Sequence, residues 1–189
     1  MSHHDLGPIS IVCVDSVADR LEISEDLDPI FFSASATQSF PSESVKAEFR
    51  ERWLGRYLTF PADRLYVAKD LGHGGRVAGY LVGCFQDPAI GSRFDDIGYF
   101  RVLKALTAAY PAHLHINFDR AYRNRGLGGK LIDAFASDCV EHGCLGVHVV
   151  TGAQSLSRPF YARNGFDHVH QFDWSGQSSV FLGRKLSCQ

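Results

Sequence analysis

This sequence has little net charge, no paired cysteine motif and no long hydrophobic run. Its 189 residues carry 19 Lys and Arg against 21 Asp and Glu, a formal charge of −2. Such a small charge does not favour nucleic-acid binding, which usually requires a basic face. No apolar run approaches the ~18 residues that span a membrane, and no basic start followed by an apolar core predicts a signal peptide. We therefore expect a cytoplasmic protein that binds neither nucleic acid nor membrane.

The cysteines give no sign of a metal site or of a disulfide framework. Their number is odd and no two form a Cys-x-x-Cys pair: Cys13, Cys84, Cys139, Cys144 and Cys188. Cys139 and Cys144 lack the second pair that a zinc site requires. We predict no bound metal and thiols that stay reduced.

The chain does contain enough apolar sequence for one sizeable core. Hydrophobic residues make up 45% of it and charged residues 21%. These fractions suit a single globular domain over residues 1–189. No internal repeat, low-complexity segment or linker divides it.

The order of the expected elements predicts a mixed α/β fold. In the first half we expect strands at 9–14, 64–69 and 77–85 and one long helix at 42–57. In the second half we expect helices to alternate with strands. The helices are expected at 99–110, 130–142 and 155–164, and the strands at 113–119, 147–151 and 180–186. An antiparallel hairpin followed by strand–helix–strand units argues for one α/β domain. The shape of residues 24–40 stays open.

The most informative stretch is a glycine-rich basic turn at the start of the expected helix 130–142. It reads ArgAsnArgGlyLeuGlyGlyLys over residues 123–130. Backbone N–H groups at a helix start converge on one point, and the helix dipole adds partial positive charge there. Arg123, Arg125 and Lys130 add to that charge. We predict that this turn binds a pyrophosphate.

Two common phosphate-binding motifs do not fit this turn. A Walker loop requires a glycine where Asn124 stands and a hydroxyl residue where Leu131 stands. A Gly-x-Gly-x-x-Gly fingerprint matches Gly126 and Gly128 but meets Leu131 at its third glycine. A variant phosphate loop that binds ATP stays an alternative.

A third pattern, Arg/Gln-x-x-Gly-x-Gly/Ala, fits at every specified position from Arg123 to Gly128. Further along, Tyr161 precedes the Gly-Phe pair at 165–166 at the spacing Tyr-x-x-x-Gly-Phe. With these two motifs the chain resembles the GNAT acetyltransferase superfamily over residues 113–186.

A narrower resemblance rests on two strand segments. HisLeuHisIleAsnPhe at 113–118 and PheLeuGlyArgLysLeu at 181–186 resemble bacterial relatives of the acetyltransferase-like domain attached to O-GlcNAc hydrolases. This second resemblance predicts no substrate.

The GNAT resemblance implies a fold and a cosubstrate. It implies a GNAT-like single domain with a central mixed twisted sheet, splayed between the parallel strands 113–119 and 147–151 and flanked by helices. Acetyl-CoA would bind between these strands, with no metal. Its pantetheine would pair with backbone groups of residues 117–119, and an N–H near Phe118 would polarise the thioester carbonyl.

The resemblance also implies which residues contact the cofactor. They lie on the motif strand, the phosphate turn and the later helix: Phe118, Asp119, Arg123, Arg125, Gly126, Leu127, Gly128, Gly129, Lys130, Gln154 and Tyr161.

The implied chemistry is direct attack of an amine on the thioester. Tyr161 matches the family's tyrosine beside the sulfur and is the candidate general acid for the leaving thiolate. Asp119 is the candidate base and Asn117 is expected to orient the amine. His115 lies on the same strand face as Asn117 and is an alternative base.

Several positions depart from the family pattern, so two functions stay open. Gln154 stands where Asn is usual, Ser157 replaces Ala, and Pro159 falls inside the expected helix, which would start late or kink. No base carboxylate is obvious. The two functions are an acetyl-CoA-dependent N-acetyltransferase acting on an unidentified amine, and a catalytically weak acyl-CoA-binding module. A homodimer is a family-level expectation.

Overall fold

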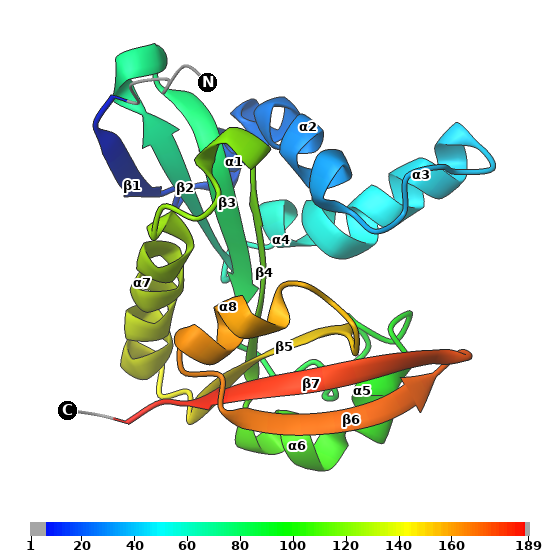
Figure 1. Cartoon of the computed structure of the whole chain (residues 1–189). Helices are drawn as coiled ribbons and strands as arrows, with labels where there is room; N and C mark the ends of the chain where they lie inside the picture. The colour runs from blue at the N-terminus through cyan, green and yellow to red at the C-terminus, as the bar shows by residue number, and fades with distance from the viewer. Residues whose placement is uncertain (1–6, 188–189) are drawn as a thin grey trace. The chain divides into compact units, whose positions relative to one another are not determined.

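The computed structural model of the protein describes residues 7–187 (Figure 1). Its strands are β1 (Ile9–Cys13), β2 (Arg64–Asp70), β3 (Arg76–Cys84), β4 (Ala112–Phe118), β5 (Gly146–Gly152), β6 (His168–Trp174) and β7 (Gln177–Lys185). Its α-helices are α1 (Val17–Glu22), α2 (Ser24–Ala34), α3 (Glu43–Arg50), α4 (Arg56–Thr59), α5 (Tyr99–Val102), α6 (Lys104–Ala109), α7 (Leu127–Glu141) and α8 (Arg158–Arg163). The expectation of a reduced Cys188 lies outside the described residues.

The chain forms two compact units. Unit 1 takes in the chain up to Gly83 together with His115–Asp133, and unit 2 takes in Cys84–Leu114 and the chain from Ala134 onward. The strand β4 and the helix α7 each contribute residues to both units. That residues 1–189 form one domain stays a prediction.

Unit 1 is built on an antiparallel sheet. β1 pairs with β2 from Ile9–Asp70 to Cys13–Tyr66, and β2 pairs with β3 around a tight turn, with a bulge between Ala68 and Lys69. The glycines of that turn, Gly74 and Gly75, have φ of 67° and 78°, a region that favours glycine. The predicted hairpin over 64–85 is therefore confirmed.

The helices of unit 1 are fastened by a buried arginine. Arg20 of α1 is fully buried, and its guanidinium donates hydrogen bonds of 2.7–3.0 Å to the carbonyls of Val14, Asp15, Phe60 and Asp63. Burial lowers the pKa of Arg20, and the four carbonyls compensate the buried charge. One side chain therefore joins α1 to the residues that precede it and to the residues that follow α4.

The long helix predicted over 42–57 exists but is interrupted. Ser42 caps it as expected, because its side chain accepts from the Val45 N–H. A π-helical turn over Glu51–Gly55 then separates α3 from α4. Residues 24–40, left open from the sequence, contain α2, in which Pro29 lies inside the helix.

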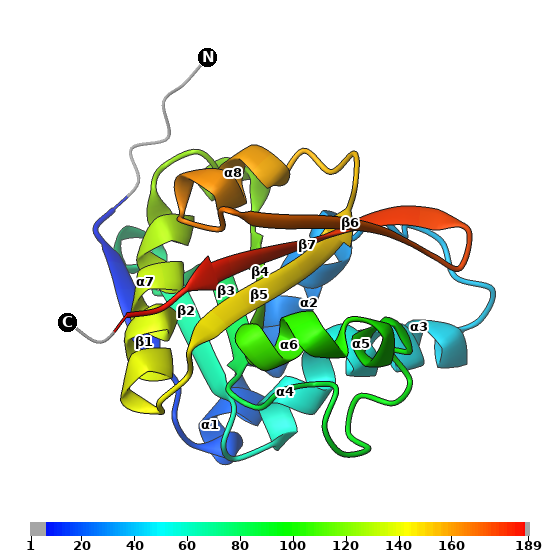
Figure 2. The ribbon, with the colours of Figure 1, turned by 90° about the horizontal axis from the view of Figure 1, so that it is seen from below.

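Unit 2 contains a second set of paired strands. β5, β7 and β6 pair antiparallel, and the first residues of β4 pair parallel with β5 at Ala112–Val147 and His113–His148. Figure 2 shows α5 and α6 lying beside β5. The buried Leu103, Tyr110 and Phe181 form the cluster beneath these two helices.

Two features of unit 2 differ from the expectation. The helix predicted over 99–110 is broken at Leu103 into α5 and α6. β6 was not expected at all, because most of its side chains are exposed and its sequence lacks the alternation of a half-buried strand.

The predicted fold class is confirmed. The strands follow the order β1-β2-β3-β4-β5-β7-β6, a mixed sheet in which β4 and β5 are the parallel pair, and helices flank it. Between residues 7 and 187, no helix has the length and apolar character that crossing a membrane requires.

Candidate functional site

The predicted phosphate turn lies in unit 1 and leads directly into α7. The helix begins at Leu127, three residues before the predicted start at Lys130. Its first backbone hydrogen bond runs from the Lys130 N–H to the Gly126 carbonyl at 3.4 Å. The N–H groups of 127–129 therefore have no acceptor within the helix, which is what an anion site at a helix start requires.

The residues before the helix are exposed and tightly turned. Asn124 and Gly126 have φ of 61° and 75°, and residues 123–126 are exposed to solvent. A Cβ on Gly126 would meet no atom within 4 Å, so this glycine serves the backbone conformation rather than a packing contact. The turn is open to a ligand.

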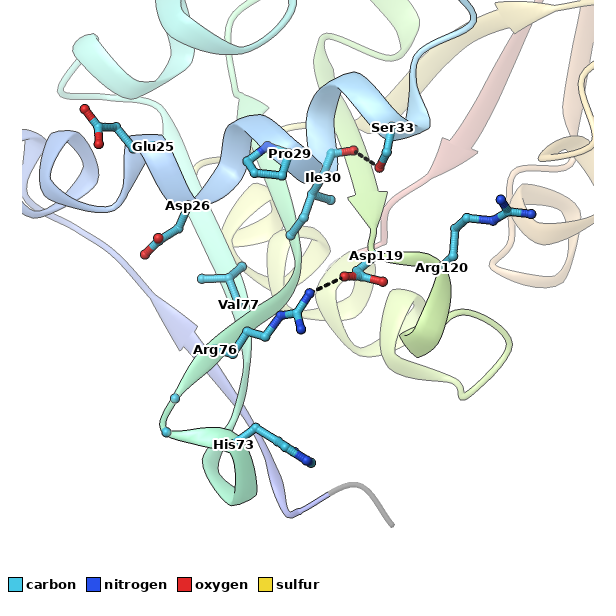
Figure 3. Close-up of a pocket in the computed structure, with 12 residues that line it drawn as sticks. Glu25, Asp26, Pro29, Ile30, Ser33, His73, Arg76, Val77, Asp119 and Arg120 are labelled. Atoms are coloured by element: carbon cyan, nitrogen blue, oxygen red, sulfur yellow. Dashed lines mark hydrogen bonds and ion pairs between the residues drawn. The ribbon is translucent and has the colours of Figure 1, made fainter. Parts of the chain in front are cut away.

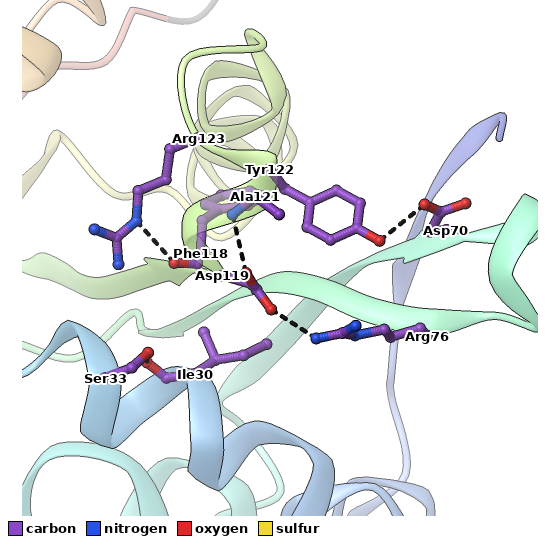
Figure 4. A network of polar contacts seen from close by, with 9 residues as sticks. All are labelled: Ile30, Ser33, Asp70, Arg76, Phe118, Asp119, Ala121, Tyr122 and Arg123. Atoms are coloured by element: carbon purple, nitrogen blue, oxygen red, sulfur yellow. Dashed lines mark hydrogen bonds and ion pairs between the residues drawn. The ribbon is translucent and has the colours of Figure 1, made fainter. Parts of the chain in front are cut away.

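Two buried side chains anchor the two ends of this turn. Tyr122 and Leu127 pack with Ala68 and Ala78 in one core cluster, against which Phe118 also packs. The Tyr122 hydroxyl donates to the Asp70 carboxylate at 2.9 Å. Figure 4 shows this bond reaching from the turn to the end of β2. The exposed amides are thus carried on a rigid base.

Asp70 gathers three donors at the end of β2. Besides Tyr122, the Gly72 N–H donates to it at 3.0 Å and the His73 ring lies 2.9 Å away. Burial opposes ionisation of Asp70, but these hydrogen bonds outweigh it and lower the pKa of the carboxyl. Asp70 is therefore an ionised support for Tyr122.

Asp119, the predicted base, has both carboxylate oxygens engaged. One accepts from the Ala121 N–H at 2.9 Å and caps the 3-10 turn Arg120–Tyr122. The other accepts from the Arg76 guanidinium at 2.8 Å (Figure 4). An incoming amine would have to compete with these donors for a lone pair. A role for Asp119 as base stays a prediction.

Phe118 ends β4 at the place where the pantetheine was expected. The Asp119 N–H donates to the Ala78 carbonyl of β3 at 3.0 Å. Because neighbouring backbone groups of a strand alternate in direction, the Phe118 N–H points away from β3. The Phe118 carbonyl accepts from Arg123 Nε at 3.0 Å, so this arginine folds back onto the strand.

The polar side chains along β4 form pairs with tyrosines of unit 1. Asn117 donates to the Tyr80 hydroxyl at 2.9 Å, and His115 Nε2 lies 3.1 Å from the Tyr57 hydroxyl. Burial raises the pKa of Tyr80, which keeps its hydroxyl protonated. Asn117 and His115 are therefore oriented by buried tyrosines, and their roles at the substrate stay predictions.

A cleft of about 670 Å³ opens in unit 1 beside Asp119 (Figure 3). Its walls are one side of α2 from Glu25 to Ser33, the β2–β3 turn with the start of β3, and the residues after β4. Glu25 and Asp26 supply carboxylates on one side, and Arg76 and Arg120 supply guanidinium groups on the other. The cleft therefore offers both signs of charge next to a predicted site residue.

Tyr161, the predicted general acid, lies in α8 of unit 2. Its ring is 8% exposed and packs edge-to-face on Phe160 and Phe166. Among the described residues, its hydroxyl has no hydrogen-bond partner. Burial raises the pKa of Tyr161, so the phenol carries its proton throughout the neutral range. A general acid requires that state.

The remaining predicted contact, Gln154, is exposed in the turn after β5. The helix that follows starts at Arg158 rather than at Ser155, so Pro159 occupies the first turn of α8. A proline there loses no helical hydrogen bond. Of the two effects expected of Pro159, a late start or a kink, the structure shows the late start.

Sequence reasoning missed the residues that support the predicted phosphate turn and the end of β4 before it. Arg76, Asp70 and Tyr80 lie on β2 and β3, far from the motifs in sequence. Only the pairing of β3 with the end of β4 brings them there, and no local pattern encodes that pairing. A buried Tyr122 directly before the motif was the one available signal. In the described part of the chain, no three His, Cys, Asp or Glu side chains are grouped to hold a metal.

Comparison with known proteins places the chain in a family. The model of the Acetyltransferase (GNAT) family matches residues 22–166. The chain belongs to this family, and it is an acyltransferase by class, as the two motifs predicted. No curated protein matches the sequence.

Solved structures share the fold at low sequence identity. SsHAT is 23% identical over 93% of this chain and 98% of its own, with a TM-score of 0.64. The polyamine N-acetyltransferase of Drosophila melanogaster, which forms N-acetylagmatine, is 20% identical over 95% and 100% of the two chains, with a TM-score of 0.62. The acetyltransferase yncA of Salmonella typhimurium, solved with its cofactor acetyl-CoA, is 18% identical over 95% and 94%, with a TM-score of 0.55. The resemblance to the domain of O-GlcNAc hydrolases stays a prediction.

Proposed function

We propose that this protein transfers the acetyl group of acetyl-CoA to an amine. One observation carries the proposal: the free first-turn amides of α7 stand on an exposed turn that is anchored by Tyr122 and Leu127. Family membership supports the reaction class, and a neighbour of the same fold holds acetyl-CoA.

The residues of the turn fit a diphosphate. Residues 120–130 contain no carboxylate and four basic residues, Arg120, Arg123, Arg125 and Lys130. The helix dipole and these cations favour an anion at the same point. When bound, acetyl-CoA would supply the activated acetyl group.

The chain's own residues would then position the cofactor and move protons. The Phe118 N–H would donate to the thioester carbonyl. Tyr161, held protonated by burial, would give its proton to the departing sulfur. Asn117, fixed by Tyr80, would orient the amine. His115, beside Tyr57, and Asp119 are the candidates to take the amine's proton.

A second function is favoured by the state of Asp119. Because both of its oxygens accept hydrogen bonds, a weak base would leave an acyl-CoA-binding module with little turnover. Steady-state release of free CoA separates the two functions. The panel should contain agmatine, an aminosugar and a peptide with a free amino terminus.

The binding claim is tested with Gly128→Glu. A carboxylate in the first turn of α7 would face the diphosphate, and such like-charge contacts cost several kcal/mol. Calorimetry should record a loss of acetyl-CoA affinity of roughly a hundredfold or more. The matched control, Ser137→Glu, adds the same charge to an exposed position of the same helix and should bind normally.

The outcomes distinguish the alternatives. Unchanged affinity in Gly128→Glu would refute the assignment of the turn. Tight binding of ATP in place of acetyl-CoA would make the turn a nucleotide site. Binding of acetyl-CoA without CoA release across the panel would support the module.

A further inference from the structure

Two cysteines lie at the C-terminal end of α7, Cys139 in its last turn and Cys144 just after it. The helix ends in a Schellman turn: the Cys144 N–H donates to the Cys139 carbonyl at 2.8 Å, and the Gly143 N–H donates to the Val140 carbonyl at 2.9 Å. Gly143 has the φ of 71° that this turn requires. The chain reversal therefore places Cys144 directly over Cys139.

This backbone bond sets an upper limit on the separation of the two residues. From each Cα to its bonding atom is one or two covalent bonds, so the two Cα atoms lie within about 7 Å of each other. A disulfide forms within that limit and not beyond it. Each thiol affects the pKa of the other, so the two side chains lie near each other. The Cys144 thiol also donates to the Phe85 carbonyl at 3.6 Å.

The two thiols differ in access and in acidity. Cys139 is fully buried, whereas Cys144 is partly exposed. The nearby Cys139 thiol lowers the pKa of Cys144, and the nearby Cys144 thiol together with burial raises the pKa of Cys139. Cys144 is thus the thiol that ionises and meets solvent first. Cys139 is the buried and protonated thiol of the pair.

We infer that Cys139 and Cys144 are a peroxide-sensitive pair that closes into a disulfide across the last turn of α7. The Cys144 thiolate attacks hydrogen peroxide, the O–O bond breaks, and sulfenic acid and hydroxide form. The Cys139 sulfur then attacks the sulfenic sulfur, the S–O bond breaks, and the hydroxyl leaves as water. The sulfurs lose two electrons in total, and one peroxide becomes two waters.

Cys84 is the competing partner in unit 2. It is fully buried, accepts from the Arg93 guanidinium at 3.4 Å and donates to the Gln86 carbonyl at 3.9 Å. These bonds hold its sulfur, and no backbone hydrogen bond ties it to Cys139 or Cys144 among the described residues. A linkage that includes Cys84 would contradict the inference.

The test is a linkage map of the full-length protein. Reduced protein is treated with hydrogen peroxide at neutral pH, alkylated with N-ethylmaleimide, and cleaved after Glu141, which lies between the two cysteines. The expected product is a linked peptide pair that lacks two hydrogens, carries no maleimide at Cys139 or Cys144, and separates on reduction. It should form at least about tenfold faster than any modification of Cys84.

Variants assign the two roles. In Cys139→Ser, Cys144 should accumulate sulfenic acid, trapped with dimedone, because no second thiol is at hand. In Cys144→Ser, Cys139 should stay reduced, because it is buried. The control Cys84→Ser should leave the linked pair unchanged. If Cys139 and Cys144 of the parent protein can both still be alkylated after peroxide treatment, the inference is wrong. This result does not depend on whether the variants fold.

Discussion

In unit 1, the buried Arg20, Asp70 and Tyr122 all have hydrogen-bond partners, whereas in unit 2 the His148 Nε2 and the Tyr161 hydroxyl have none among the described residues. Buried polar atoms without partners are rare in folded proteins, because each forfeits a hydrogen bond to water. The paired groups of unit 1 hold backbone in place. In unit 2, burial is the main cause that keeps His148 neutral and Tyr161 protonated, although the His148 Nδ1 lies 2.6 Å from the Tyr110 carbonyl.

The difference has a functional meaning for the two tyrosines. Tyr122 donates to Asp70, and burial together with this contact raises the pKa of Tyr122. The pKa of Tyr161 is raised by burial only. A hydroxyl that already donates to a carboxylate is not available to protonate a leaving group, whereas a hydroxyl without such an acceptor is available. Four measurements would break or sharpen this comparison.

The largest effect is expected from Arg20→Met. The variant keeps apolar volume but removes the guanidinium donor from the carbonyls of Val14, Asp15, Phe60 and Asp63, of which Phe60 keeps a second donor in the Asp63 N–H. Removing one member of a buried charged network costs about 3–5 kcal/mol, and urea unfolding should show a loss of that size. Arg125→Met, at an exposed position, is the control and should change stability by less than ~0.5 kcal/mol.

Acid should destabilise the protein through His148. Burial lowers the pKa of His148 to about 4, below its unfolded value of about 6.5. The unfolded chain therefore binds a proton first as the pH falls, and stability decreases between about pH 6.5 and pH 4. The expected loss is about 3 kcal/mol.

Unfolding measured at pH 7 and pH 4 tests the role of His148. In His148→Phe the acid-dependent loss should shrink by about 3 kcal/mol. In His170→Asn, at an exposed histidine, it should stay as in the parent protein. An equal loss in all three proteins would assign the acid sensitivity to other groups.

Tyr161→Phe should slow turnover without weakening cofactor binding. Only proton donation is removed, so kcat should fall by roughly a hundredfold while acetyl-CoA affinity stays within about twofold. Rapid-quench and calorimetric measurements separate the two quantities. If kcat is unchanged, another group or water protonates the thiolate.

The smallest effect is expected from Tyr122→Phe, the matched change in unit 1. It removes one hydrogen bond to an ionised carboxylate and should cost roughly 1 kcal/mol of stability. Its kcat should stay within about threefold of the parent, because Tyr122 holds the turn rather than giving a proton. A kcat as low as that of Tyr161→Phe would erase the distinction between the tyrosines.

The sequence predicted local features well and distant contacts poorly. The motif from Arg123 to Gly128, the hairpin over 64–85 and the cap at Ser42 each depend on neighbouring residues, and all have the expected local structure. The pairing of Asp119 with Arg76 depends on two strands meeting at their ends. The exposed strand β6 carries no apolar periodicity to reveal it.

Gly79 of β3 leaves space for the Phe118 ring at the end of β4. A Cβ at this position would overlap the Phe118 ring, which lies on the bare glycine backbone. Any larger residue there would lift the ring and, with it, the strand end that leads to Asp119. A substitution at Gly79 would therefore displace the end of β4 without replacing any residue that the sequence predicts to contact the cofactor.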